Sequence, residues 1–193
     1  MKTMLKLSAA VAILAATAAP AFAASVLTVD FNRVFTDSAA AKSGVAQLRA
    51  KYDAQIQQRN TAFQQAVQSF QTLQNQLQAI KPPAQVTAAQ RTSYQQAGER
   101  AEAAQNAVAQ LEQEVQTVNR YVQSQILQKV TPIAEQLRNE RKADVVVPTG
   151  SVLASDPAND VTAIVIQRLD AAFPNPSITL PTQPAAPAQG PGR

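Results

Sequence analysis

Two pairs of closely spaced carboxylates come closest to the residue types and spacing that acid–base chemistry requires. They are Glu99 with Glu102, and Glu112 with Glu114. Paired carboxylates can act as general acid and general base where their environments separate their pKa values. Both pairs fall in a long helical pattern, at positions that we expect to face solvent. We therefore interpret them as ordinary surface charge, and the sequence favours a protein that is not an enzyme.

The residue types that carry most other site chemistry are absent from the sequence of 193 residues, which contains no His and no Cys. Their absence removes the commonest general base and the usual ligands of zinc and haem. It also excludes nucleophiles that depend on a histidine. Neither GxxxxGK[ST] nor GxGxxG occurs, and these are the phosphate-binding patterns of nucleotide sites. We therefore expect no cofactor and no metal.

The first 23 residues have the pattern of a cleavable signal peptide. Lys2 and Lys6 precede an apolar run from Leu7 to Ala19, and Ala21-Phe22-Ala23 provides a small-x-small cleavage site. The run is too short to span a bilayer comfortably, although a retained anchor is the alternative. We predict that residues 1–23 are removed on export.

The net charge of the whole chain is +4, and without Lys2 and Lys6 it falls to +2. This is weak support for a nucleic-acid partner, and we expect none. The stretch 59–100 carries four cations against the single acid Glu99, which gives it a net charge of +3. These cations are candidate contacts for acidic partners or an anionic membrane surface, and the alternative is an ordinary solvated helix face. They are Arg59, Lys81, Arg91 and Arg100.

Two long helical patterns occupy the middle of the chain. From Ala39 to Ile80 there is no Pro, and apolar residues recur at spacings of three, four or seven, beginning with Val45 and Leu48. From about Thr87 to Lys142 a second apolar seam has a spacing typical of a coiled coil. Pro82 and Pro83 end the first helix, and Thr87 can cap the second. Residues 39–142 are thus predicted to form an antiparallel helical hairpin with its turn at 81–87, and a globular four-helix bundle is the alternative.

Short strand patterns flank this hairpin at 26–30, 144–148 and 151–154. An apolar helical face follows from about residue 160 to Phe173. We predict an α+β fold in which residues 24–38 and 143–173 form a small β-rich body, with the hairpin inserted as a projecting arm. Six of the residues 174–193 are Pro, so we expect a disordered Pro/Ala-rich tail there.

A body of this size is marginal as a monomer, and without Cys it has no disulfide to stabilise it. The run Val145-Val146-Val147 is typical of a strand covered on both faces. A single small sheet with one helix covers only one face, so we predict that a second copy of the chain covers the other. The candidate oligomerisation residues are Val26, Leu27, Val29, Val145, Val146 and Val147.

Gly44 and Pro132 are candidate pivots of the arm, and Gly98 marks another soft point. Pro132 is expected to kink the second helix near the base of the arm, because it removes a helix hydrogen bond. The alternative for both glycines is a small residue tolerated in a helix-packing face.

Several short motifs, taken together and in order, resemble the OmpH (Skp) family of periplasmic chaperones. Residues 29–38 follow the pattern V-D-x-x-x-[VI]-x-x-x-S, and the hairpin comes next. The family closes with a strand, a turn, a second strand and the start of a helix. The segments of this chain that resemble them are, in that order, Asp144 to Pro148, Thr149-Gly150, Ser151 to Ala154 and Asp160-Val161-Thr162. Leu169-Asp170 resembles the end of the closing helix. The resemblance covers about residues 25–173.

This resemblance implies a periplasmic homotrimer with a β-rich trimerisation body and tentacle-like coiled-coil arms around a cavity. Unfolded outer-membrane proteins would be held there without ATP. Family members often have arms rich in Lys and Arg, whereas this chain has 23 Gln between Gln47 and Gln136. Neutral amides would keep the arm soluble and still contact many sequences. The alternative is a structural coiled-coil or adaptor protein of the cell envelope.

Overall fold

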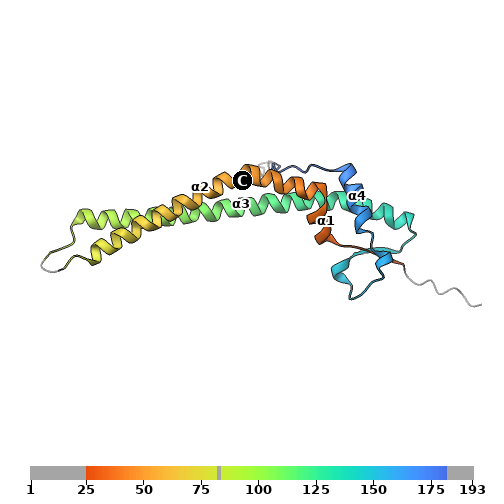
Figure 1. Cartoon of the computed structure of the whole chain (residues 1–193), viewed down its shortest axis with the longest axis horizontal. Helices are drawn as coiled ribbons and strands as arrows, with labels where there is room; N and C mark the ends of the chain where they lie inside the picture. Colours follow the sequence, from red (N-terminus) through yellow and green to blue (C-terminus); the bar gives the residue numbers. More distant parts are fainter. Residues whose placement is uncertain (1–24, 82–83, 182–193) are drawn as a thin grey trace, which may run out of the picture.

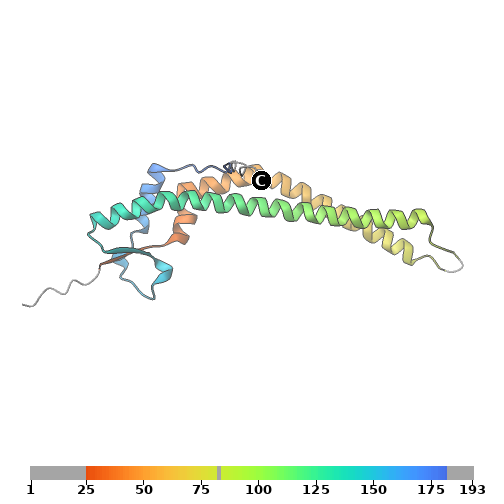
Figure 2. The same ribbon diagram turned by 180° about the vertical axis from the view of Figure 1, so that it is seen from behind.

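The computed structural model describes residues 25–81 and 84–181, which form a small body at one end of a long two-helix arm (Figures 1 and 2). The predicted signal peptide, the Pro82-Pro83 pair of the predicted turn, and residues 182–193 of the predicted tail lie outside the described residues. The described chain begins at the body, and the arm points away from it.

The arm consists of α2 (Ala39–Gln78) and α3 (Ala88–Glu140), which lie side by side and antiparallel. Ser38 caps α2, because its hydroxyl accepts a hydrogen bond from the N–H of Ala41 at 3.2 Å. Thr87 and Gln90 form a capping box at the start of α3. With 40 and 53 residues, the helices are about 60 and 80 Å long. The two helical patterns of the sequence are therefore present, with ends within about two residues of those predicted.

The predicted apolar seam of α3 is buried along the inner half of the arm. Its buried members there are Leu111, Val118, Val122, Ile126, Val130, Ile133 and Leu137, and Ala97 is also buried nearer the tip. On α2 the predicted stripe is wrong at Val45, whose side chain is 45 % exposed, whereas Gly44 and Leu48 are buried. The close approach of the helices at Gly44 places the seam along that residue, so Val45 lies about 100° further round the helix.

The body brings together the segments that precede and follow the arm in the sequence. Its sheet has two parallel strands, β1 (Val26–Val29) and β2 (Val145–Pro148), with Val26 opposite Val145. The short helix α1 (Phe31–Asp37) follows β1, and α4 (Thr162–Ala172) closes the body. One apolar core connects both strands, α1, α4 and the base of the arm, and it includes Val34, Val165 and Leu169, all fully buried. The arm is thus inserted between two strands of one sheet.

The strand predicted at 151–154 is wrong. Thr149–Ser151 forms a 3₁₀ turn, and the Leu153 side chain is fully exposed. A tight hairpin after β2 would need a positive φ in the turn, but Gly150 does not have one. A second 3₁₀ turn, Pro157–Asn159, leads to Asp160, which forms an isolated parallel bridge with Thr28. Asp160 therefore takes the place beside β1 that another strand would occupy.

The expectation of a disordered tail does not hold for its first eight residues. Residues 174–181 turn back from α4 and run along α2 towards the middle of the arm (Figure 1). Asn175 is hydrogen-bonded to Ser43 of α2, and Ser177 is hydrogen-bonded to Gln125 of α3. A high content of Pro predicts poor secondary structure, but it does not prevent an extended segment from packing on a preformed surface.

Helix α3 continues through Pro132, which lies inside it without ending it. Pro132 lacks an N–H group, so the helix has one backbone hydrogen bond fewer at this point. Among the helices of residues 25–81 and 84–181, none is both long enough and apolar enough to cross a membrane.

Candidate functional site

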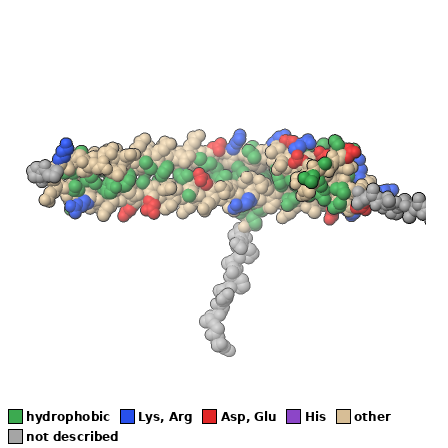
Figure 3. Space-filling view, turned by 90° about the horizontal axis from the view of Figure 1, so that it is seen from below, with side chains coloured by type: hydrophobic (Ala, Val, Ile, Leu, Met, Phe, Trp, Pro, Cys, Tyr) green, Lys and Arg blue, Asp and Glu red, His purple; other side chains and the backbone are tan. Residues whose placement is uncertain are grey.

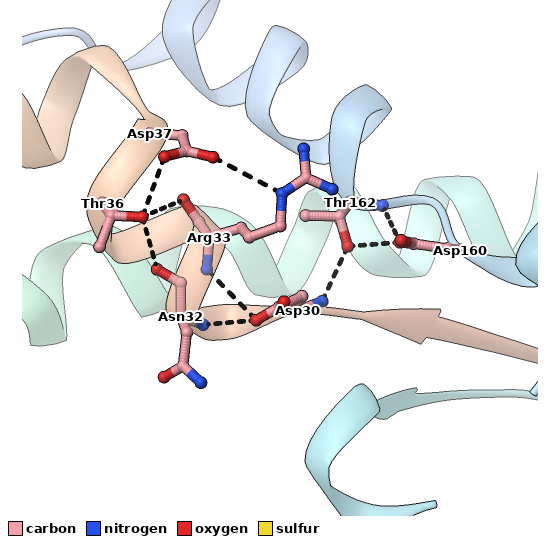
Figure 4. A network of polar contacts seen from close by, with 7 residues as sticks. All are labelled: Asp30, Asn32, Arg33, Thr36, Asp37, Asp160 and Thr162. Atoms are coloured by element: carbon pink, nitrogen blue, oxygen red, sulfur yellow. Dashed lines mark hydrogen bonds and ion pairs between the residues drawn. The ribbon is translucent and has the colours of Figure 1, made fainter. Parts of the chain in front are cut away.

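The motifs that flank the arm in the sequence meet in one hydrogen-bonded joint within the body (Figure 4). Asp30 caps α1, because its Oδ1 accepts hydrogen bonds from the N–H groups of Asn32 at 2.9 Å and Arg33 at 3.2 Å. The N–H of Asp30 donates to Oγ1 of Thr162 at 2.8 Å. Two residues 132 positions apart are therefore joined directly.

Asp160 and Thr162 form the other half of the joint. Oδ1 of Asp160 accepts hydrogen bonds from the Thr162 N–H at 2.8 Å and from the Thr162 hydroxyl. The N–H of Val161 donates to the carbonyl of Thr28 at 3.0 Å. Thr162 is fully buried, so its hydroxyl needs these partners. The Asp-Val-Thr motif thus fixes the start of α4 against β1.

A second joint places the arm on the body. Oδ1 of Asp170 in α4 accepts a hydrogen bond from the N–H of Ala39, the first residue of α2, at 2.7 Å. Together with the Ser38 cap it satisfies two of the free N–H groups at this helix end. At the base of α3, Arg168 of α4 makes two hydrogen bonds to Glu140, at 2.9 and 2.7 Å. These bonds to Arg168 hold the pKa of Glu140 below its usual value.

The structure divides the candidate oligomerisation residues into two groups. Leu27 and Val29 of β1 are buried within the chain's own core, and Val26 is half-buried. On β2, Val145 is 40 % exposed, and Val146 and Val147 are half-buried. An apolar groove of about 390 Å³ runs between these three valines and the base of α3. The unpartnered apolar surface therefore lies on β2, and its part in oligomerisation stays a prediction.

The four candidate cations are all exposed in the outer half of the arm. Figure 3 shows basic side chains near the end of the arm, with most of the surface there polar and uncharged. Between α2 and α3 in this half lies an open groove of about 820 Å³. It is lined mainly by small and amide side chains, among them Gln65, Ser69, Ser93 and Gln96, and also by Arg100. The groove brings Arg100 together with neutral polar groups.

Both glycines of the arm lie at helix–helix contacts. A Cβ atom at Gly44 would come within 2.7 Å of Cγ1 of Val122 and 3.4 Å of Cγ of Pro176. A Cβ at Gly98 would lie 3.3 Å from the Phe70 ring. These distances support the alternative interpretation, in which the glycines permit close packing. Movement at Gly44 or Pro132 stays a prediction.

One carboxylate of the predicted pairs has a structural partner that the sequence did not indicate. The hydroxyl of Tyr52, which is buried in the seam, donates to Oε1 of Glu114 at 2.6 Å. Nζ of Lys51 lies 3.9 Å from the same oxygen. Burial, and then the hydrogen bond to Glu114, raise the pKa of Tyr52. The available signal was a tyrosine within an apolar stripe, because a buried hydroxyl needs a partner.

No group of three or more acidic side chains able to hold a metal ion occurs in the described part of the chain. The described residues thus present packing joints, an open apolar groove beside β2, and a long polar arm with a groove in its outer half. Such surfaces can bind other polypeptides over an extended area.

The comparisons with known proteins agree with this arrangement. The chain matches the family described as outer membrane protein (OmpH-like) over residues 25–169. It also resembles the crystal structure of a Caulobacter crescentus protein assigned as an OmpH-like outer membrane chaperone. That match has a TM-score of 0.58 and 19 % sequence identity, and it covers 80 % of this chain and 89 % of the other. No curated protein matches the chain. Because the family match extends over well more than half of the sequence, this chain belongs to the OmpH-like outer membrane protein family.

Proposed function

We propose that this protein is an ATP-independent holdase of the periplasm, which binds unfolded outer-membrane proteins between its arms and keeps them from aggregating. The observation that supports this most directly is the arm itself, two helices of 40 and 53 residues that project from a much smaller body. Its surface is polar and rich in amides, and the groove in its outer half is open to solvent. The predicted signal peptide supports export to the periplasm.

The client chemistry explains why such an arm suits the task. Unfolded barrel proteins expose apolar strands with unpaired backbone groups, and these aggregate through their edges. Many weak contacts along a long surface retain such a chain through multivalency, without selecting one sequence. The open groove in the outer half of the arm and the exposed amides around it offer contacts of this kind.

The same proposal includes assembly as a homotrimer through the β2 face. An isolated two-stranded sheet is marginal in water, and the apolar groove beside Val145, Val146 and Val147 leaves one face of this sheet open. A second copy that covers this groove would bury Val145 and complete the core. Three arms projecting from one assembled body would then enclose a space between them.

The charged residues of the outer arm have a secondary part in this proposal. Arg59, Lys81, Arg91 and Arg100 attract clients or lipid headgroups of negative charge, and the neutral glutamines make the short-range contacts. Electrostatic attraction of this kind acts mainly on the rate of association and weakens with salt.

An aggregation assay tests the function. A urea-unfolded outer-membrane barrel protein is diluted into buffer with increasing amounts of the mature chain, and turbidity is recorded without ATP. The proposal expects turbidity to fall to the baseline at a fixed ratio of chain to client. If turbidity is unchanged at any ratio while the chain stays folded by circular dichroism, the holdase proposal is wrong and a structural or adaptor role replaces it.

A further inference from the structure

Residues 174–181 are seated on the arm as an extended segment, hereafter the strap (Figure 1). Pro176 is buried and Ile178 is half-buried, whereas Asn175, Ser177 and Thr179 are exposed. This alternation with a period of two residues is that of a β-strand with one face on an apolar surface. The strap therefore lies on the arm as a strand lies on a core.

Its apolar side chains fill a depression between α2 and α3. Pro176 lies over Gly44, where an added Cβ would be only 3.4 Å from the proline Cγ. Ile178 packs against both apolar clusters of the arm, the one at the base and the one around Tyr52 and Val118. Pro176 therefore packs over the backbone of α2 at the point where Gly44 lets α2 and α3 approach closely.

Most of the hydrogen bonds between the arm and the strap join side chains of the arm to backbone groups of the strap. Gln125 makes a two-way contact with Ser177, in which its Oε1 accepts from the backbone N–H at 3.0 Å and its Nε2 donates to the backbone carbonyl at 2.7 Å. Nε2 of Gln47 donates to the carbonyl of Pro176 at 3.0 Å. The hydrogen bond from Ser43 to the Asn175 side chain, at 2.8 Å, is the contact that depends on the residue type.

Recognition through the main chain tolerates many sequences, provided that the segment is extended and alternates apolar with polar residues. Strands of outer-membrane barrels have this alternation, and before folding their backbone groups are unpaired. The arm thus holds, in its own strap, a segment with the pattern of the clients proposed above.

We infer that the depression between α2 and α3 at Gly44, Gln47 and Gln125 is a binding site for one extended strand of an unfolded barrel protein, and that the strap occupies this site in competition with the client. This inference rests on the proposed holdase function and gives it a defined contact at the base of the arm. The strap covers the apolar depression in the free protein and leaves it when a client strand enters.

The test uses the full chain and four variants. Ile178→Ser weakens the strap and leaves the site intact, and Leu180→Ser is its control, because that side chain is 40 % exposed at the end of the strap. Gln125→Ala, placed in the Ile178→Ser background, removes the main-chain contact. Gln128→Ala in the same background is its control, since Gln128 is an exposed residue of the same helix.

The probe is a fluorescently labelled eight-stranded outer-membrane barrel protein diluted from urea, and its affinity is measured by anisotropy. We expect Ile178→Ser to bind it two- to tenfold more tightly than wild type, and Leu180→Ser to bind it equally. Adding Gln125→Ala should reverse the gain by a similar factor, since each hydrogen bond changes an equilibrium by about this amount. Adding Gln128→Ala to Ile178→Ser should leave the affinity for the client unchanged. Hydrogen exchange of residues 175–179 in the wild type should become faster when the client binds.

The outcomes separate this inference from the function on which it rests. If wild type binds the client but Ile178→Ser binds it equally or more weakly, with unchanged circular dichroism, competition at the strap is excluded and the holdase proposal stands. If Gln125→Ala has no effect in the weakened background, the site is not where the client binds. If no variant and no wild-type chain binds the client, both proposals are wrong.

Discussion

Lys142 has a backbone φ of 53° at the point where the chain leaves α3. The N–H of Ala143 donates to the carbonyl of Arg138 at 2.9 Å, and that of Lys142 to the carbonyl of Asn139 at 3.2 Å. These two bonds form a Schellman motif, in which the residue with positive φ is usually Gly. Side chains with a Cβ atom are strained there by about 1 kcal/mol.

Lys142→Gly should therefore raise the free energy of unfolding, because it relieves about 1 kcal/mol of backbone strain. The net gain is smaller than this, because Gly has more conformational freedom in the unfolded chain. Urea unfolding at fixed protein concentration measures it. Lys142→Ala is the matched control, because Ala keeps the Cβ atom and should leave the midpoint near that of wild type. Equal midpoints for the Gly and Ala variants would show that the strain is absent.

Tyr52 offers a test that depends on pH. Tyr52→Phe removes the hydrogen bond to Glu114 and should lower the free energy of unfolding by about 0.5–1.5 kcal/mol at pH 7. Folding raises the pKa of Tyr52, so the folded chain binds the phenol proton more strongly than the unfolded chain. The contribution of the Tyr52 phenol to the free energy of unfolding is thus fully present below pH 10, the ordinary pKa of Tyr, and is lost as the pH rises further.

The Tyr52→Phe variant should lose less stability than wild type between pH 9 and pH 11, measured by urea unfolding at each pH. If the free energy of unfolding falls equally steeply with pH in the wild type and in the variant, the assignment of this hydrogen bond is wrong.

At the scale of elements, the joint between β1, α1 and α4 determines how the arm is attached. Asp30 caps α1 and donates its N–H to Thr162, and Asp160 holds the start of α4. The parallel pairing of β1 with β2 requires a crossover, and here the whole arm is that crossover. The joint therefore aligns two elements that the arm separates by more than a hundred residues.

Thr162→Val should loosen this joint. It leaves the N–H of Asp30 without its partner in a partly buried place, at a cost of about 1–3 kcal/mol. Urea unfolding measures the loss, and the exchange of the Asp30 amide proton should become faster. Thr92→Val is the control, because its exposed hydroxyl bonds only to a carbonyl of its own helix at 3.1 Å. Equal effects of the two substitutions would contradict a role for the joint.

The elements also show what the sequence allows one to predict. The arm helices follow from a periodicity repeated over many turns and from the Thr87 cap, and the pairing of 26–29 with 145–148 follows from two matched strand patterns. The four residues 151–154 are too few for such a pattern to be distinctive, and the backbone at Gly150 does not turn as a hairpin requires. The strap and the Tyr52–Glu114 contact depend on partners between 52 and 132 residues away, and no local pattern reports such contacts.

At the scale of the whole molecule, the two ends of the protein differ in their residue types. The body and arm base contain the apolar core, whereas the outer arm is polar and carries a few cations (Figure 3). We expect clients to enter from the outer end, where surface attraction acts over about 10 Å at 0.1 M salt.

Replacing Arg59, Lys81, Arg91 and Arg100 together by Gln should weaken the binding of an acidic unfolded client several-fold at low salt. The difference should disappear at 0.5 M salt, because exposed charges are then screened. Fluorescence anisotropy at the two salt concentrations measures it. The control replaces four exposed cations near the body, Lys42, Arg49, Arg141 and Lys142, and should have less effect. Unchanged affinity at low salt would exclude the charged-tip contact.

We propose that several copies of this chain join through their bodies and enclose one unfolded client between their arms. Light scattering on the chain with and without a urea-diluted outer-membrane barrel protein tests it directly. We expect the mass of a trimer for the free chain, and the mass of one trimer with one client for the complex. A free chain with the mass of a monomer, and a client that elutes separately from it, would show that the arms do not enclose a client in this way.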